Sequence, residues 1–165
     1  TVVIIFSLLF RVATISGPSM QNTLFTDDKV IISNLGYTPK RGDIVVISRN
    51  VNNSVEDAAT SKEPIIKRVI ATGGQTVDID FSTGKVYVDG TELDEPYVAA
   101  PTYAQEGNTF PMVVPEGKLF LMGDNRNDST DSRSPMVGCV DERYILGVVK
   151  CRLMPNFTFF GKSDN

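Results

Sequence analysis

The sequence contains no histidine, so nucleophilic catalysis by a serine in this chain would have to use another base. A Ser-His-Asp triad is therefore impossible, and lysine is the usual substitute for the histidine. Two candidates stand out by their surroundings. Ser19 lies within SGPSMQNTL (16–24), and Lys67 lies within PIIKRVIA (64–71).

Lys67 has the apolar surroundings that suit a general base. Isoleucine and valine flank it on both sides in the sequence. Burial among such side chains disfavours the ammonium form and lowers the pKa of the amine, which lets it accept a proton near neutral pH. The adjacent Arg68 adds a positive charge that acts in the same direction. The alternative is a lysine at a strand edge whose stem lies along the surface while its ammonium reaches water.

Ser19 follows a Gly-Pro pair that stiffens the chain before it. Pro18 fixes its own φ and is expected to push Gly17 toward an extended conformation, while glycine permits the close approach of another chain. A stiff backbone suits a nucleophile whose hydroxyl must meet a carbonyl at a set angle. Taken alone, however, SGPS is more typical of a plain surface turn.

A third motif, GDNRNDSTDSR (123–133), interleaves acids, arginines and hydroxyls. As a calcium loop starting at Asp124, it would place Arg126 at a ligand position and lack the glycine that an EF-hand requires, so no metal is expected. The pattern instead predicts a self-contained network of ion pairs and hydrogen bonds that makes a site rigid.

The elements that must position these residues are strands. Short segments rich in β-branched and aromatic residues alternate with Gly, Asp, Asn and Pro, which predicts a mainly β, antiparallel fold with little helix. TVDIDFSTGKVYVDGTEL (76–93) predicts a hairpin. We expect an exposed loop at 49–64 and, because of its four prolines, a small excursion from the core at 95–117. The expected strands are 29–33, 43–48, 64–71, 76–81, 85–90, 118–123 and 144–153.

Size and composition limit the chain to one principal core. It has 165 residues, 41% of them hydrophobic, and a net charge of −4. Without a basic stripe this charge argues against nucleic acid as a partner. Cys139 and Cys151 are expected to be two unpaired thiols, and a bridge between them is the alternative.

The first ten residues, TVVIIFSLLF, are almost all apolar. They are about half of the roughly 20 residues that span a bilayer as a helix. Without a basic region before them they are not an intact signal peptide. We interpret residues 1–12 as the end of a membrane anchor or a membrane-proximal segment, with a buried first strand as the alternative.

Four motifs in this order make the chain resemble a known family. SGPSMQNTL, PKRGDIVVI (39–47), IKRVIATGG (66–74) and GDNRNDSTDSR resemble the successive signature boxes of type I signal peptidases. These are membrane-anchored Ser/Lys endopeptidases that remove signal peptides from exported proteins. The resemblance implies that Ser19 is the nucleophile and Lys67 the general base.

The resemblance also implies roles for supporting residues. Ser129 matches the serine that orients the lysine, whereas Asp131, Arg133 and Arg68 match structural ion pairs. The implied fold is a β core of the signal-peptidase type with a small inserted hairpin cap and no cofactor. The implied division is a catalytic core at 13–77 and 116–160 and a cap at 78–115.

The implied substrate is the cleavage region of a signal peptide, with small residues at −1 and −3, bound extended against strand edges. Ile15 and Ile66, each near a catalytic residue, are candidate pocket walls, and a role in the core is equally consistent. Membrane lipid is an implied partner, for which the phenylalanines of MPNFTFF (154–160) are candidates unless they close the core. The implied location is the plasma membrane, with the catalytic domain on the extracytoplasmic side.

One departure from the family pattern concerns the oxyanion hole. Gly17 stands where some members have a serine whose hydroxyl helps to stabilise the oxyanion, so the backbone N–H of Ser19 is the donor that the sequence identifies. Other departures are Asn22, where many members have proline, and ATGGQ (71–75), where GLPGD is more usual.

Three rival functions remain open on sequence alone. A self-cleaving repressor of the SOS type has a Ser/Lys dyad and a β-rich core, but it needs a DNA-binding domain where this chain starts with an apolar run. A signal-peptidase-like assembly factor without protease activity would have lost the catalytic pair, whereas Ser19 and Lys67 are both present. A plain structural β domain would make four ordered motifs a coincidence.

Overall fold

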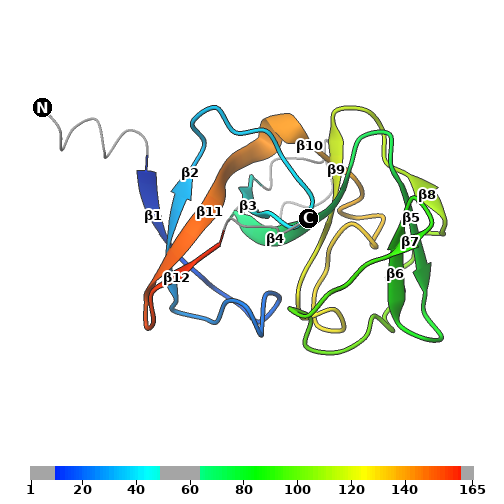
Figure 1. The fold of residues 1–165 in the computed structure, drawn as a ribbon, viewed down its shortest axis with the longest axis horizontal. Helices are drawn as coiled ribbons and strands as arrows, with labels where there is room; N and C mark the ends of the chain where they lie inside the picture. Colours follow the sequence, from blue (N-terminus) through cyan, green and yellow to red (C-terminus); the bar gives the residue numbers. More distant parts are fainter. Residues whose placement is uncertain (1–9, 49–63, 161–165) are drawn as a thin grey trace, which may run out of the picture.

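Two antiparallel sheets make up the computed structural model, which describes residues 10–48 and 64–160 (Figure 1). The larger sheet has the order β1-β2-β11-β3-β4-β9-β10, with β12 paired to β11, and the smaller has the order β7-β6-β5-β8. The predicted antiparallel β fold is confirmed, and η1 is the one helical element within the described ranges. The bounds are β1 (Phe10–Thr14), β2 (Lys29–Ser33), β3 (Ile44–Ile47), β4 (Ile65–Thr72), β5 (Thr76–Asp80), β6 (Lys85–Val88), β7 (Thr91–Glu92), β8 (Met112–Val113), β9 (Lys118–Met122), β10 (Val140–Asp141), η1 (Glu142–Tyr144), β11 (Ile145–Met154) and β12 (Thr158–Phe159).

The central strands of the larger sheet explain the continuous apolar runs in the sequence. All four residues of β3 are buried, and β4 is buried except at its two ends. Each of these strands has a neighbour on both sides, β11 and β4 for β3, and β3 and β9 for β4. The side chains on both faces of β3 and β4 are buried, so charged residues within these strands are exceptions that need a reason. In β4 these exceptions are Lys67 and Arg68, which are both buried.

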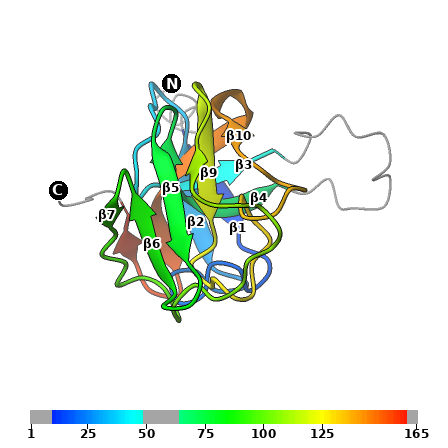
Figure 2. The same cartoon turned by 90° about the vertical axis from the view of Figure 1, so that its right-hand side faces the viewer.

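The smaller sheet packs against the larger one through a shared apolar cluster. Figure 2 looks onto this sheet, with strands of the larger sheet behind it. The cluster joins residues of β4, β5, β6 and β9, including Ile70, Val77 and Phe120. The ring of Phe110 contacts those of Phe81 and Phe120 edge to face, with centroids 5.7 and 5.8 Å apart. The second sheet is therefore held by buried aromatic contacts.

The predicted excursion at 95–117 contains no strand apart from the two residues of β8, which pair at the end of the smaller sheet. Whether residues 78–115 form a separate cap remains a prediction. The predicted anchor concerns mainly residues 1–9, which lie outside the described residues, whereas residues 10–12 belong to β1. The predicted loop at 49–64 lies outside them as well, apart from its last residue. Within the described part of the chain, no helix is long and apolar enough to cross a bilayer.

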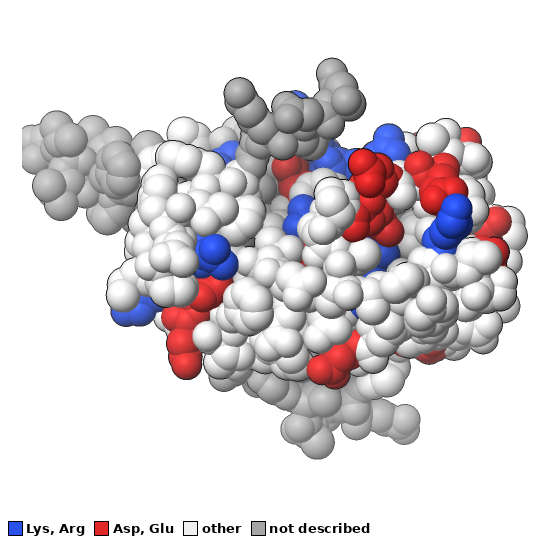
Figure 3. Space-filling view, turned by 60° about the horizontal axis from the view of Figure 1, so that its bottom comes forward, with Lys and Arg blue, Asp and Glu red and all other residues white. Residues whose placement is uncertain are grey.

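The surface charges are mixed rather than separated by sign. On the face in Figure 3, basic and acidic side chains lie next to one another, and wide uncharged areas separate these groups. Cys139 and Cys151 are both free, which confirms the prediction of two unpaired thiols.

Candidate active site

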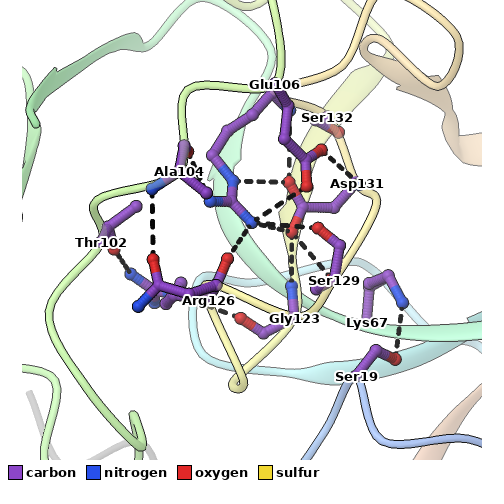
Figure 4. Close-up of polar contacts among 12 residues, drawn as sticks. Ser19, Lys67, Thr102, Ala104, Glu106, Gly123, Arg126, Ser129, Asp131 and Ser132 are labelled. Carbon is purple, nitrogen blue, oxygen red and sulfur yellow. Dashed lines mark hydrogen bonds and ion pairs between the residues drawn. The ribbon is translucent and has the colours of Figure 1, made fainter.

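Ser19 and Lys67 meet, although 48 residues separate them in the sequence. The Lys67 amine lies 2.8 Å from Ser19 Oγ and donates a hydrogen bond to it (Figure 4). Lys67 is 4% exposed. The surface alternative considered for this lysine is therefore wrong, since its amine ends in the protein at a serine hydroxyl.

The position of Lys67 follows from the geometry of β4. The residue pairs with Val45 of β3 in the sheet register, and its neighbour Arg68 pairs with both β3 and β9. Successive side chains of a strand point to opposite faces, so Lys67 and Arg68 leave β4 on different sides. Lys67 faces Ser19, whereas the Arg68 guanidinium binds the Asp124 carboxylate at 2.8 and 2.7 Å.

Arg68 is fixed by more than its carboxylate partner. It donates to the carbonyl oxygen of Gly42 at 2.7 Å, and its guanidinium lies 3.9 Å from the centre of the Tyr97 ring. Thr23, from the segment after Ser19, donates its hydroxyl to Asp124. A bidentate ion pair with an aromatic face against it is a rigid arrangement. Through Asp124 it connects β4 to the loop 123–133 and to the segment after Ser19.

The loop that carries Ser19 is anchored on both sides of this serine. Before it, Ile15 exchanges backbone hydrogen bonds with residues 27 and 28 at 2.9 Å. After it, Met20 is fully buried and its carbonyl accepts from the backbone N–H of Leu24 at 2.9 Å. The backbone N–H of Asn125 donates to the Ser19 carbonyl at 3.0 Å. The serine is thus held by its backbone, and its hydroxyl is left to the lysine.

Gly17 does not adopt the extended conformation expected from the proline that follows it. Its φ is +88°, in a region where glycine is favoured because a Cβ would be strained. A serine side chain is therefore disfavoured here, and residue 17 offers no hydroxyl to an oxyanion. Within residues 10–48 and 64–160, the backbone N–H of Ser19 donates to no backbone acceptor, and its role as an oxyanion donor remains a prediction.

The GDNRNDSTDSR loop (123–133) centres on Asp131, which is completely buried. Arg133 donates from Nε and Nη2 to its carboxylate, both at 2.8 Å. The Ser129 hydroxyl and the backbone N–H of Gly123 donate to the same carboxylate, each at 3.0 Å. A buried carboxylate with this many donors is fully compensated, and it fixes the Ser129 side chain in return.

Gly123 is where this loop packs against the segment that carries Ser19. A Cβ at this position would overlap the Ser129 side chain and the Ser19 carbonyl oxygen. The absence of a side chain is therefore what lets the Ser129 side chain and the Ser19 carbonyl oxygen both pack against residue 123. Sequence reasoning did not single out this glycine, because nothing local marks it as a packing position.

The loop is not the self-contained network that the sequence predicts. The partner of Asp124 is Arg68 from β4, and the partner of Arg126 is Glu95, at 2.8 and 2.5 Å, with the Thr102 hydroxyl at 2.9 Å. Asp128 is exposed. Two of the loop's buried charges are thus compensated from elsewhere, so the loop depends on segments far from it in sequence.

Ile15 and Ile66 lie in one buried apolar cluster, which also contains Met20, the residue after Ser19. The exposed fractions of the two isoleucines are 5% and 9%. The core role considered for them is therefore present, and their role as pocket walls remains a prediction. Within the described residues, no group of three His, Cys, Asp or Glu side chains is arranged to hold a metal ion.

A buried lysine amine in contact with a serine hydroxyl, on an antiparallel β scaffold, is the arrangement required of a Ser/Lys hydrolase. The model of the family "Signal peptidase, peptidase S26" matches residues 1–154. The chain therefore belongs to the S26 signal peptidase family, as its four sequence motifs predict.

Individual relatives agree with this family. The chain is 38% identical over 144 residues to the "Probable signal peptidase I-2" of Synechocystis, covering 86% of this chain and 62% of that protein. It is 33% identical over 157 residues to "Signal peptidase I" of Bacillus amyloliquefaciens, covering 89% and 75%. The crystal structure of a signal peptidase I from Enterococcus faecalis matches with a TM-score of 0.50 at 27% identity, covering 68% of this chain and 97% of that one.

Proposed function

We propose that this chain is a membrane-associated serine endopeptidase that removes N-terminal signal peptides from exported preproteins. The observation that carries the proposal is the 2.8 Å contact between Lys67 Nζ and Ser19 Oγ, in a partly buried site of a chain of this family. Ser19 is the nucleophile and Lys67 the general base. An assembly factor without activity is disfavoured because this pair is intact.

The mechanism follows from the protonation of the pair. Burial favours the neutral amine, so Lys67 accepts the Ser19 proton as Oγ attacks the scissile carbonyl. The backbone N–H of Ser19 stabilises the resulting oxyanion. Lys67 then returns the proton to the leaving amine, which frees the C-terminal product and leaves an acyl-enzyme. A water molecule that gives its proton to Lys67 hydrolyses the ester and restores Ser19.

The supporting residues keep this geometry. Ser129 orients the lysine, and Asp131 with Arg133 holds Ser129. Arg68 fixes β4 through Asp124. None of these groups exchanges protons with the substrate in this mechanism; they reduce the motion of the two that do.

The substrate that we propose has small residues at −1 and −3, with Ile15 and Ile66 as walls of shallow pockets. Both isoleucines belong to the cluster beside the pair, where a large side chain would meet packed core. Changing Ala to Phe at −1 of a preprotein is expected to lower kcat/KM about 100-fold, because the bulk cannot be accommodated. Processing is followed by gel shift and the new N-terminus by mass spectrometry.

The matched control places Phe at −2, a position that an A-x-A pattern leaves free, and there kcat/KM is expected to stay within about threefold. Equal cleavage of the −1 Phe and −1 Ala preproteins would contradict the proposed selectivity. No cleavage of either preprotein would contradict the proposed function.

The proposed location is the plasma membrane, with the catalytic part on the extracytoplasmic side, where exported preproteins emerge. The hairpin of β11 and β12 carries exposed Met154, Phe157 and Phe159, and the two phenylalanine rings contact each other edge to face at 4.8 Å. Met154 pairs with Lys29, just after the loop of Ser19. This apolar tip supports membrane lipid as a partner beside the active site.

Changing both Phe157 and Phe159 to serine is expected to reduce the stimulation of preprotein cleavage by detergent or lipid vesicles severalfold, because two interfacial aromatic anchors are lost. Cleavage is measured with and without vesicles. Val113→Ser removes a similarly exposed apolar side chain from the smaller sheet and serves as the control. Unchanged stimulation in a double variant with wild-type thermal stability would contradict the lipid role.

A further inference from the structure

An irregular segment between β7 and β8 lies along the loop 123–133 and forms hydrogen bonds with it throughout its length. We call residues 99–108 the strap. The strap and the loop 123–133 exchange backbone and side-chain hydrogen bonds in both directions, so the strap acts as a second support of the site. The bonds are Ala99 N to Asp124 O at 3.3 Å, Asn127 Nδ2 to Pro101 O at 3.0 Å, Tyr103 N and Ala104 N to Asn127 Oδ1 at 3.0 and 3.1 Å, Arg133 Nη1 to Ala104 O at 2.8 Å, and Asn108 N and Nδ2 to the carbonyls of Arg133 and Ser132 at 2.9 Å.

Glu106 is the one acid of the strap, and its carboxylate points into the loop (Figure 4). Oε2 accepts a hydrogen bond from the backbone N–H of Asp131 at 3.1 Å, and Oε1 lies 3.7 Å from Arg133 Nη2. The side chain is 17% exposed. Glu106 therefore contacts the two residues that hold Ser129.

The backbone at this point is adapted to that orientation. Glu106 has a φ of +55°, which is uncommon for a residue with a side chain, and Gly107 follows with +114°. A non-glycine residue keeps this conformation when surrounding contacts hold it there. Here a backbone hydrogen bond from Gly107 N to the Gln105 carbonyl at 2.8 Å closes a turn centred on Glu106. From this turn the carboxylate reaches the loop, where Asp131 N–H and Arg133 hold it.

The charge of Glu106 also reaches the base. Burial, with the neighbouring Asp131 carboxylate, raises the pKa of the Glu106 carboxyl above its usual value, although the Asp131 backbone N–H, Arg133 and, to the smallest extent, Lys67 act in the opposite direction. Electrostatic attraction between two groups is mutual, so the ionised carboxylate that is favoured by the Lys67 ammonium favours this ammonium in turn. Arg68, the other cation of β4, is directed to Asp124 instead.

We propose that Glu106 is a positioning residue for the Ser19–Lys67 pair: it holds the backbone of Asp131 and the guanidinium of Arg133, and its negative charge acts on the base. The proposal rests on the catalytic roles proposed above. The strap would then set both the geometry of the site and the pH range in which its base is free. Such a role lies outside the four sequence motifs, since Glu106 belongs to none of them.

The test separates the two roles with two variants. Glu106→Gln keeps an oxygen that accepts from the Asp131 N–H but removes the charge, so Lys67 loses its proton more readily. The acidic limb of the kcat/KM profile for preprotein cleavage is expected to move down by about 0.5 pH unit. Glu106→Ala removes the acceptor as well, and kcat on the plateau is expected to fall about tenfold further than in the Gln variant.

Glu92→Gln is the matched control. It makes the same charge change in the same inserted part, but Glu92 pairs with Lys85 in the open, with both side chains about half exposed. Its profile is expected to coincide with that of the wild type. An acidic limb of Glu106→Gln that coincides with wild type, or that moves to higher pH, would overturn the inference.

Ser19→Ala is assayed in parallel so that the two proposals fail separately. If Ser19→Ala still cleaves, the proposed function is wrong. If it is inactive and the Glu106→Gln limb is unshifted, the inference alone is wrong. Thermal unfolding of each variant identifies any loss of fold, and the limb position is independent of the amount of folded enzyme.

Discussion

Ser19→Ala is expected to lower kcat for preprotein cleavage by about four orders of magnitude or more, which is complete loss in an ordinary assay. The variant keeps the oxyanion donor, because this is a backbone N–H. It also keeps the hydrogen bond from Asn125, which is made to the Ser19 carbonyl. What it loses is the oxygen that attacks the substrate, so binding of the preprotein should persist without turnover.

The fold gives no reason for Ser19→Ala to unfold the protein. The side chain is partly exposed, and the residues that anchor this loop in the core are Ile15 and Met20. Ser16→Ala, an exposed serine three residues upstream, is the matched control and should cleave at the wild-type rate. Product formation is measured with purified protein and checked by mass spectrometry. Wild-type-like processing by Ser19→Ala would end the assignment of the nucleophile.

The strands could be predicted from the sequence because their cause is local. β2 matches its expected range, β9 differs from its range by one residue at one end, and β3 and β4 differ from theirs by one residue at each end. The side chains on both faces of β3 and β4 are buried, so the sequences of these strands are continuous runs rich in β-branched residues between turn residues. The same logic identified Lys67, since a lysine within such a run must be compensated by something close to it.

The contact between Ser19 and Lys67 could be inferred only by combining local signals with a resemblance. Their separation of 48 residues follows no short-range rule, and the sheet register that aligns β3, β4 and β9 is a property of the whole fold. The missing histidine made a lysine base necessary for a serine nucleophile. The order of the four motifs then selected which lysine and which serine.

The supports of the catalytic loop could not be predicted, because they come from segments without regular structure. Glu95 reaches Arg126 across 31 positions and Glu106 reaches Asp131 across 25. No periodicity encodes such contacts, since an irregular segment can follow many paths of similar length. Their importance is visible only once Arg126 and Arg133 are found to be fully buried.

These buried charges explain why the loop 123–133 and β4 have few alternative positions. A buried guanidinium without its carboxylate costs several kcal/mol, on the order of 3–5 when one partner is removed. Arg126 and Arg133 therefore allow few alternative positions for the loop. Arg68 does the same for β4 through Asp124. Ser129, bound to Asp131, and Lys67, on β4, are both buried among these constraints, which favours a fixed geometry for the proposed Ser19–Lys67 pair.

Lys67→Ala is expected to lower kcat by about a thousandfold or more, because no other group at Ser19 is assigned to take its proton. Lys67→Arg distinguishes a proton-accepting base from a fixed positive charge. It keeps a positive charge, but a guanidinium does not lose its proton in a protein, so this variant should be as inactive as the alanine variant. If the lysine acted only as a fixed positive charge, arginine would restore part of the activity.

The wild-type pH profile provides an independent check on the role of Lys67. A base that is neutral in the free enzyme gives kcat/KM an acidic limb, and burial places this limb well below the reference lysine pKa of about 10.4. Both Lys67 variants should lack this limb in any residual activity. Lys85→Ala, which removes an exposed lysine that pairs with Glu92, is the control and should keep the wild-type profile. Processing by Lys67→Ala at the wild-type rate, in a protein of unchanged thermal stability, would show that Ser19 is activated by some other group.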